Sequence, residues 1–212
     1  MSGFKTIHDH HHHFGWDNSL EPVLIVEPGA ELELETIDSG GGQLNEASTA
    51  ADVAKIDFSK VNPVTGPVYV EGAEPGDAVE VEILDFDESG WGWTGIIPGF
   101  GLLADEFTEP FMNISRYDEK RVVFQPGIEL PTRPFPGTIG LALAEPGSHS
   151  VVPPRAQGGN LDVRDLTRGT KLWLPVAVPG ALLSIGDTHA AQGDGEVCGT
   201  AVETAMTVRV RV

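Results

Sequence analysis

The stretch Pro67–Leu84, PVYVEGAEPGDAVEVEIL, decides the fold class. Two runs rich in valine and other strand-forming residues lie on either side of a turn signal at Glu74–Gly76. In the second run, Val79, Val81 and Ile83 alternate with glutamates, which is the pattern of a strand with one buried and one solvated face. The stretch therefore predicts β-structure on both sides of a tight turn.

Runs of the same kind recur along the whole chain, and glycine and proline turns separate them. They include PVLIV (22–26), ELELE (31–35), LWLPVAV (172–178) and TVRVRV (207–212). Helical signals are confined to two short segments, Ser48–Lys55 and Asn160–Arg168. The sequence thus predicts a mainly β fold, a two-sheet β-sandwich of jelly-roll type with a few short helices.

Length, charge and cysteine content narrow the functional classes. The 212 residues suit one domain, and their net charge of −19 would repel nucleic acid and anionic membranes. The sequence has neither an apolar run long enough to span a membrane nor the apolar core of a signal peptide, so we expect a cytoplasmic protein. The acidity suits either a salt-adapted host or an ordinary acidic enzyme. With one cysteine, Cys198, any metal would need histidine or carboxylate ligands.

The densest polar cluster is SIGDTHAAQGDGEVCGTAVETA, at Ser184–Ala205. Asp187 and His189 are two residues apart, so on a strand they project from the same face and suit one metal ion. The alternative is a hydrogen-bonded core histidine, with Asp187, Asp194 and Glu196 serving as turn residues. The residues alone leave both interpretations open.

Three further segments offer weaker signals. Asn160 and Asp162 could form a site, but residues of this kind more often cap a helix start and complement its charge. The segment Trp91–Leu103 predicts a packed aromatic loop, or less readily a substrate lid. Of the five histidines between positions 8 and 13, neighbours alternate sides on an extended chain, so we single out only His13, beside Phe14 and Trp16.

Taken together, several of these segments resemble the acetamidase/formamidase family in order and spacing. They include HHFGWDNSLEPVLIVEPGAELELE, DSGGGQL, PFPGTIGLAL and the long run from VPPRAQGGNLD through GDTHAAQGDGEVCGTAVET. The resemblance extends over nearly the whole chain. It implies a jelly-roll-like β-sandwich, a divalent metal with zinc as the expected ion, and hydrolysis of short aliphatic amides such as acetamide and formamide.

The resemblance also marks six matching polar positions: His13, Asn160, Asp162, Asp187, His189 and Glu203. On chemical grounds we assign Asp162, Asp187 and His189 as metal ligands, and Glu203 as the group that moves protons. His13 or Asn160 would polarise the carbonyl oxygen. Cys198 as a nucleophile is the competing chemistry, although a cysteine in EVCGTAV more often packs as a small apolar residue.

One departure from the family concerns the end of the chain. Family members continue past the strand that ends here at Val212, so residues 1–212 are expected to form a single family-like β domain without the C-terminal part. The strand Thr207–Val212 would then leave an exposed sheet edge, and we expect a homo-oligomer. A non-catalytic metal-binding or small-ligand-binding β-sandwich is the alternative function.

Overall fold

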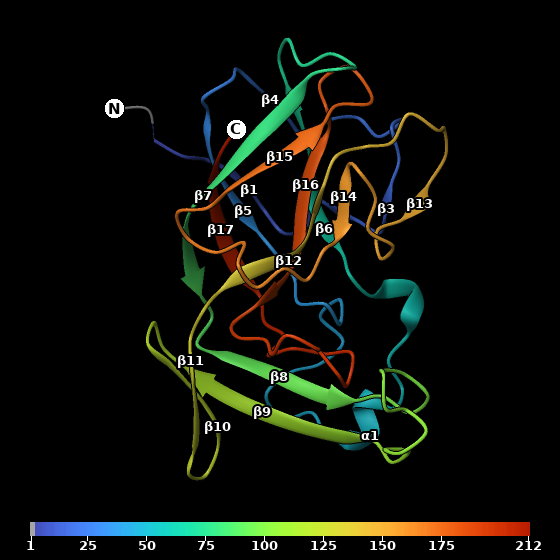
Figure 1. Cartoon of the computed structure of the whole chain (residues 1–212), viewed down its shortest axis with the longest axis vertical. Helices are drawn as coiled ribbons and strands as arrows, with labels where there is room; N and C mark the ends of the chain where they lie inside the picture. The colour runs from blue at the N-terminus through green and yellow to red at the C-terminus, as the bar shows by residue number, and fades with distance from the viewer. Residues whose placement is uncertain (1–2) are drawn as a thin grey trace.

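The computed structural model describes residues 3–212, and its strands form four sheets (Figure 1). The five-stranded sheet has the order β1 (Lys5–Ile7), β5 (Glu31–Glu35), β17 (Met206–Arg211), β7 (Ala78–Glu88) and β15 (Lys171–Pro175). The six-stranded sheet has the order β14 (Gly158–Asn160), β12 (Phe135–Gly140), β16 (Leu183–His189), β6 (Val64–Val70) and β2 (His12–His13), with β4 (Leu24–Val26) also paired to β6.

Two smaller sheets and two short helices complete the fold. The four-stranded sheet has the order β11 (Ile128–Pro131), β10 (Arg121–Gln125), β9 (Phe111–Tyr117) and β8 (Trp91–Ile96), and it lies at one end of the molecule in Figure 1. A two-stranded ribbon pairs β13 (His149–Ser150) with β3 (Gly15–Trp16). The helices are α1 (Ala50–Val53) and a 3₁₀ turn at Phe58–Lys60. The predicted mainly β class is confirmed.

The main hydrophobic core lies between the five-stranded and six-stranded sheets. Strands of the first sheet bury every second residue, among them Leu34, Val81 and Val208, as their alternating sequences predict. Strands β12 and β16 of the second sheet are buried at every position. This dense burial holds β16 rigidly, and its last residues carry the site described below. A jelly-roll connection of the two sheets remains a prediction.

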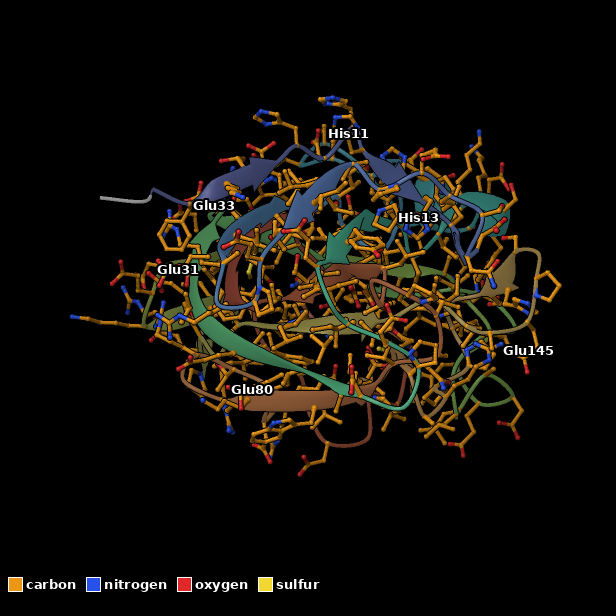
Figure 2. All side chains as sticks on the ribbon, turned by 90° about the horizontal axis from the view of Figure 1, so that it is seen from above. His11, His13, Glu31, Glu33, Glu80 and Glu145 are labelled. Atoms are coloured by element: carbon orange, nitrogen blue, oxygen red, sulfur yellow. The ribbon has the colours of Figure 1, made fainter. Side chains whose placement is uncertain are left out.

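The outer face of the five-stranded sheet carries paired charges. Arg209 of β17 bonds Glu33 of β5 at 2.8 Å, and Arg211 bonds Glu31 at 2.6 Å. Figure 2 shows these two glutamates on one side of the molecule. Such cross-strand pairs offset part of the acidic charge locally.

Three local expectations are wrong. The strand Thr207–Val212 is not an exposed edge, because β17 lies between β5 and β7 and is hydrogen-bonded to both. The predicted helix at Asn160–Arg168 is replaced by strand β14 and turns, because residues 158–160 pair with β12. The predicted aromatic loop begins as strand β8, which pairs with β9.

Two other predictions are closer to the structure. The predicted helix at Ser48–Lys55 exists in shortened form as α1, with Thr49 rather than Ser48 at its N-cap. Within residues 3–212, no helix has the length and apolar character needed to cross a membrane.

Candidate metal centre and active site

Strand β16 supplies the two side chains at the centre of the site. Asp187 and His189 lie on the same side of the strand, as their spacing predicts, and Asp187 Oδ1 is 3.1 Å from His189 Nε2. Both residues are only 1–2% exposed. The ring of Phe135, from the neighbouring strand β12, packs edge-on against His189 at a centroid distance of 4.9 Å. A buried carboxylate–imidazole pair therefore lies on a strand that is buried at every position.

Glu203 reaches the same imidazole from the segment before β17. Its backbone forms antiparallel bridges with His189 and Trp93, which fixes its position between two strands. Its Oε1 accepts a hydrogen bond from the backbone N–H of Ala201 at 2.7 Å, and its Oε2 lies 3.1 Å from His189 Nε2. Thus both Asp187 and Glu203 approach the same ring nitrogen.

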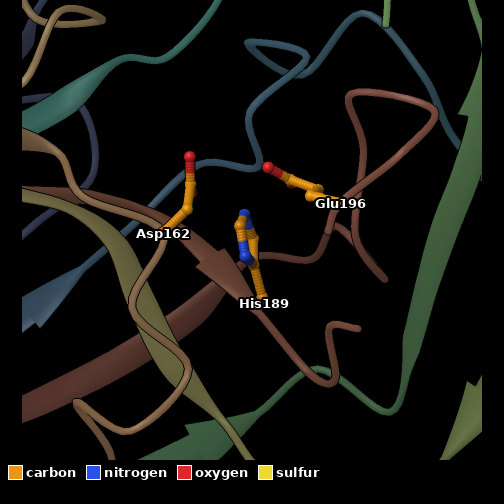
Figure 3. Close-up of side chains that lie close together, drawn as sticks. All are labelled: Asp162, His189 and Glu196. Atoms are coloured by element: carbon orange, nitrogen blue, oxygen red, sulfur yellow. The ribbon is translucent and has the colours of Figure 1, made fainter. Parts of the chain in front are cut away.

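Asp162 and Glu196 add two further carboxylates, as Figure 3 shows. One ring nitrogen of His189 is directed towards the space between them. The ligand atoms of Asp162, His189 and Glu196 lie within 4.8 Å of one another, and the same holds for Asp187, His189 and Glu203. The two groups share the imidazole, so four carboxylates surround one histidine.

The donor set fits a divalent metal. Among the described residues, two buried side-chain oxygens have no hydrogen-bond partner, and they are Asp162 Oδ1 and Glu203 Oε2. Glu203 Oε2 lies 3.1 Å from His189 Nε2, but the two atoms do not form a hydrogen bond. Unpaired buried carboxylate oxygens are costly unless a cation or proton satisfies them. Carboxylate oxygens and an imidazole nitrogen are the ligands expected for zinc when no thiolate is present.

Burial and mutual repulsion disturb the protonation of these acids. Burial, together with the charge of Asp187, raises the pKa of Asp162 to about 7. Burial and the nearby Asp162 raise the pKa of Glu196 to about 8. Burial likewise raises the pKa of Glu203. Burial opposes ionisation of Asp187 too, but the adjacent His189 keeps the pKa of this carboxyl below its usual value.

The imidazole shows the complementary effect. Burial alone would lower the pKa of His189, but Glu203 and Asp187 raise it well above its usual value. The site without a metal therefore favours positive charge at its centre. Strongly perturbed acids and a perturbed histidine, gathered at one point, are typical of a functional site.

The backbone at the site adopts an unusual conformation. Asp162, Asp187 and Glu196 have φ values of 48°, 52° and 38°, and nearby Asn62 has 50°. In the described part of the chain, these are four of the six residues other than glycine with positive φ. Side chains other than glycine rarely occupy this region, and such strained residues cluster at functional sites. The buried strand β16 holds Asp187 in this conformation, whereas Asp162 and Glu196 lie in loops beside it.

An amide and hydroxyl network orients Asn160 beside the carboxylates. The Thr138 hydroxyl donates to Asn160 Oδ1 at 2.7 Å, and Asn62 Nδ2 lies 3.3 Å from the same oxygen. Asn160 Nδ2 donates to Asp162 Oδ2. Because its oxygen is occupied by two donors, the NH₂ group of Asn160 is turned towards the site.

A cavity of about 230 Å³ opens onto this cluster. Its polar end includes Asn160, Asp187, Glu196 and Glu203. Most of its remaining wall is apolar and is formed by Ile56, Phe58, Trp93, Ile97, Phe100 and Val152. The buried Asp38 carboxylate fixes the Trp93 ring by accepting its indole N–H at 3.2 Å. The cavity is therefore shaped for a small molecule with one polar and one apolar end.

The structure brings together five of the six residues proposed from the sequence, namely Asn160, Asp162, Asp187, His189 and Glu203. His13 lies instead against Ser184, whose Oγ is 2.9 Å from its Nε2, and against the ring of Trp16. Figure 2 shows His13 further inside the molecule than His11. Cys198 borders a separate apolar hollow, with its Sγ 3.3 Å from the carbonyl oxygen of Thr200.

Several members of the site are not predicted from the sequence. One interpretation of the sequence makes Glu196 a turn residue, and no sequence pattern singles out Asn62, Thr138 or Gln192. Glu196 and Gln192 belong to the same polar segment as His189, so the composition of this segment indicates the region of the site but not these two residues. Thr138 lies on β12 and Asn62 lies just before β6, and the pairing of β12 and β6 with β16 brings both side chains to Asp187.

Comparison with known proteins finds relatives of this chain in one family. A sequence model described as the Acetamidase/Formamidase family matches residues 4–149 and 142–212. A formamidase of Methylophilus methylotrophus is 33% identical over an alignment covering 94% of this chain and 63% of that protein. An acetamidase of Mycolicibacterium smegmatis is 30% identical, with coverage of 88% and 62%. The chain thus spans less than two thirds of the length of these two curated relatives.

A solved structure supports the same likeness in three dimensions. The acetamidase from Bacillus halodurans superposes with a TM-score of 0.91 at 38% sequence identity. The superposition covers 98% of this chain and 69% of that one.

Proposed function

Because the chain belongs to the acetamidase/formamidase family, we propose that it hydrolyses short aliphatic amides to a carboxylate and ammonia. Acetamide and formamide are the expected substrates. The observation that carries the proposal is the convergence of Asp162, Asp187, Glu196 and Glu203 on the imidazole of His189 at the end of a small cavity. The cytoplasmic location and homo-oligomeric state expected from the sequence stay predictions.

Asp162, Asp187 and His189 would hold a divalent metal, with zinc as the expected ion. The unpaired Asp162 Oδ1 and the crowding of negative charge support this assignment. When bound, such a metal supplies Lewis acidity and lowers the pKa of water to about 7. Glu196 lies close enough to Asp162 and His189 to contribute a further ligand oxygen.

Glu203 is the proposed proton carrier. The Ala201 N–H holds Oε1, which leaves Oε2 free to take a proton from water. The oxygen of that water bonds to the amide carbon, and Oε2 returns the proton to the amide nitrogen as the carbon–nitrogen bond breaks. A pKa raised by burial suits this role, because a group that both takes and gives protons works best when its pKa lies near the ambient pH.

Asn160 is the group best placed to polarise the substrate carbonyl. Asn160 lines the cavity, and its NH₂ group retains one N–H beyond the bond to Asp162. A positioned amide donor of this kind stabilises negative charge that develops on a carbonyl oxygen. The apolar wall opposite would accept the acyl group. His13 is the alternative from the sequence, and its contacts lie at Ser184 and Gly15.

Ammonia release from acetamide and formamide tests the proposal. The full chain, loaded with zinc, should release ammonia from at least one of them, and a chelator should abolish the release while re-added metal restores it. A folded, metal-loaded chain that hydrolyses neither amide would instead support the non-catalytic binding function.

A further inference from the structure

Gln192 lies beside His189 in the loop after β16, and its two polar side-chain atoms have different partners. Its Oε1 is 2.9 Å from Nδ1 of His189. Its Nε2 donates to the backbone carbonyl oxygen of Asp162 at 3.0 Å. One side chain therefore connects the histidine to a carboxylate residue thirty positions earlier in the chain.

These two contacts determine which way the amide faces. A backbone carbonyl oxygen can only accept a hydrogen bond, so the NH₂ group of Gln192 must face Asp162. The amide oxygen then faces His189 and can itself only accept. It follows that the hydrogen on this side of the ring is carried by Nδ1. The contacts of Gln192 thus fix the role of Nδ1 as a donor.

The opposite ring nitrogen is the one that faces the carboxylates. His189 Nε2 lies 3.1 Å from both Asp187 Oδ1 and Glu203 Oε2. With Nδ1 carrying the hydrogen of the neutral ring, Nε2 keeps its lone pair, which is the form that binds a cation. Histidine ligands of metals usually donate their other N–H to an acceptor, and that partner governs both orientation and affinity.

We propose that Gln192 is a positioning residue that presents Nε2 of His189 to a divalent cation and ties the segment of Asp162 to it. The proposal rests on the metal site of the proposed function and names a residue outside the ligand set. The bond to the carbonyl of Asp162 supports that residue in its left-handed conformation, at a φ of 48°. The same side chain therefore orients one ligand and steadies the backbone of another.

Two substitutions separate the contacts of Gln192. Gln192→Leu removes both, whereas Gln192→Glu keeps an acceptor for the Nδ1 hydrogen and loses the donor to Asp162. Gln125→Leu on β10 is the matched control. Zinc affinity, measured on the full chain by competition with a chromophoric chelator, should fall roughly 10- to 100-fold in Gln192→Leu. It should fall less in Gln192→Glu and stay unchanged in the control.

The His189 tautomer provides a second readout that does not depend on activity. In ¹⁵N spectra of the zinc-loaded chain, His189 should carry its hydrogen on Nδ1 in the wild type and in Gln192→Glu. Wild-type affinity in Gln192→Leu, or a hydrogen on Nε2 in the wild type, would overturn the proposal. A wild-type chain that binds no zinc overturns it together with the metal assignment. A chain that binds zinc and hydrolyses no amide overturns only the proposed function.

Discussion

Asp187 Oδ1 lies 3.1 Å from Nε2 of His189, although both side chains are almost completely buried. Glu203 Oε2 approaches the same nitrogen at the same distance. Two buried carboxylates close to one imidazole repel each other unless a positive charge lies among them. A divalent metal ion among these side chains would supply such a charge.

Glu203→Gln should separate proton transfer from metal binding. The amide keeps the shape of the side chain and can still accept from Ala201, but it cannot take a proton from water. We expect amide turnover to fall roughly 100- to 10,000-fold while zinc content stays at the wild-type level. Ammonia release and elemental analysis on the same samples check this. Glu119→Gln, at an exposed turn, is the control, and full turnover in Glu203→Gln would refute the role.

The carbonyl-polarising group can be identified by two alanine variants. Asn160→Ala should lower kcat/KM roughly 100- to 1,000-fold, which is the usual cost of losing one such donor. His13→Ala should have a smaller effect, because its ring nitrogens face Gly15 and Ser184. If His13→Ala causes the larger loss instead, the alternative assignment from the sequence is the right one.

His13 should also make stability depend on pH. Burial lowers the pKa of His13 below the usual value of about 6.5. The hydrogen bond to the backbone of Gly15 and the charge of Asp17 oppose this shift, whereas the nearby His12 adds to it. Since the unfolded chain then binds this proton more strongly, the stabilising contribution is present above pH 6.5 and is lost as the pH falls through the lower folded-state pKa. Thermal melts at pH 7.5 and 5 should therefore show a larger loss for the wild type than for His13→Gln.

The exposed His10 provides the control for this measurement. His10→Gln should follow the wild type at both pH values, because its ring is exposed. If Tm falls equally in the wild type and in His13→Gln between pH 7.5 and 5, the His13–Ser184 contact does not govern the loss of stability in acid.

Salt should stabilise the chain. Its 32 acidic and 13 basic residues repel on balance, and the Debye length shrinks from about 10 Å at 0.1 M salt to about 3 Å at 1 M. We expect Tm to rise between these KCl concentrations, even though the surface ion pairs weaken. A flat or falling Tm would count against salt adaptation and would leave the family assignment untouched.

The mainly β class and the Asp187–His189 pair were predictable from sequence, because both depend on the two-residue period of a strand. The helix expected at Asn160–Arg168 failed because pairing of residues 158–160 with β12 overrides local helical preference. The pairing of the last strand, β17, could not be predicted from the sequence either, because its partners β5 and β7 lie far away along the chain. Glu196 and Gln192 were missed because loop conformation, rather than spacing, turns them towards His189.

Metal content is the most direct test of the central claim that Asp162, Asp187 and His189 hold a divalent ion. Elemental analysis of the purified full chain should find one stoichiometric metal ion in the wild type, and also in His10→Ala and His11→Ala, whose side chains are exposed and do not line the cavity. His189→Ala and Asp162→Ala should each contain none while remaining folded. Full metal occupancy in His189→Ala would contradict the account.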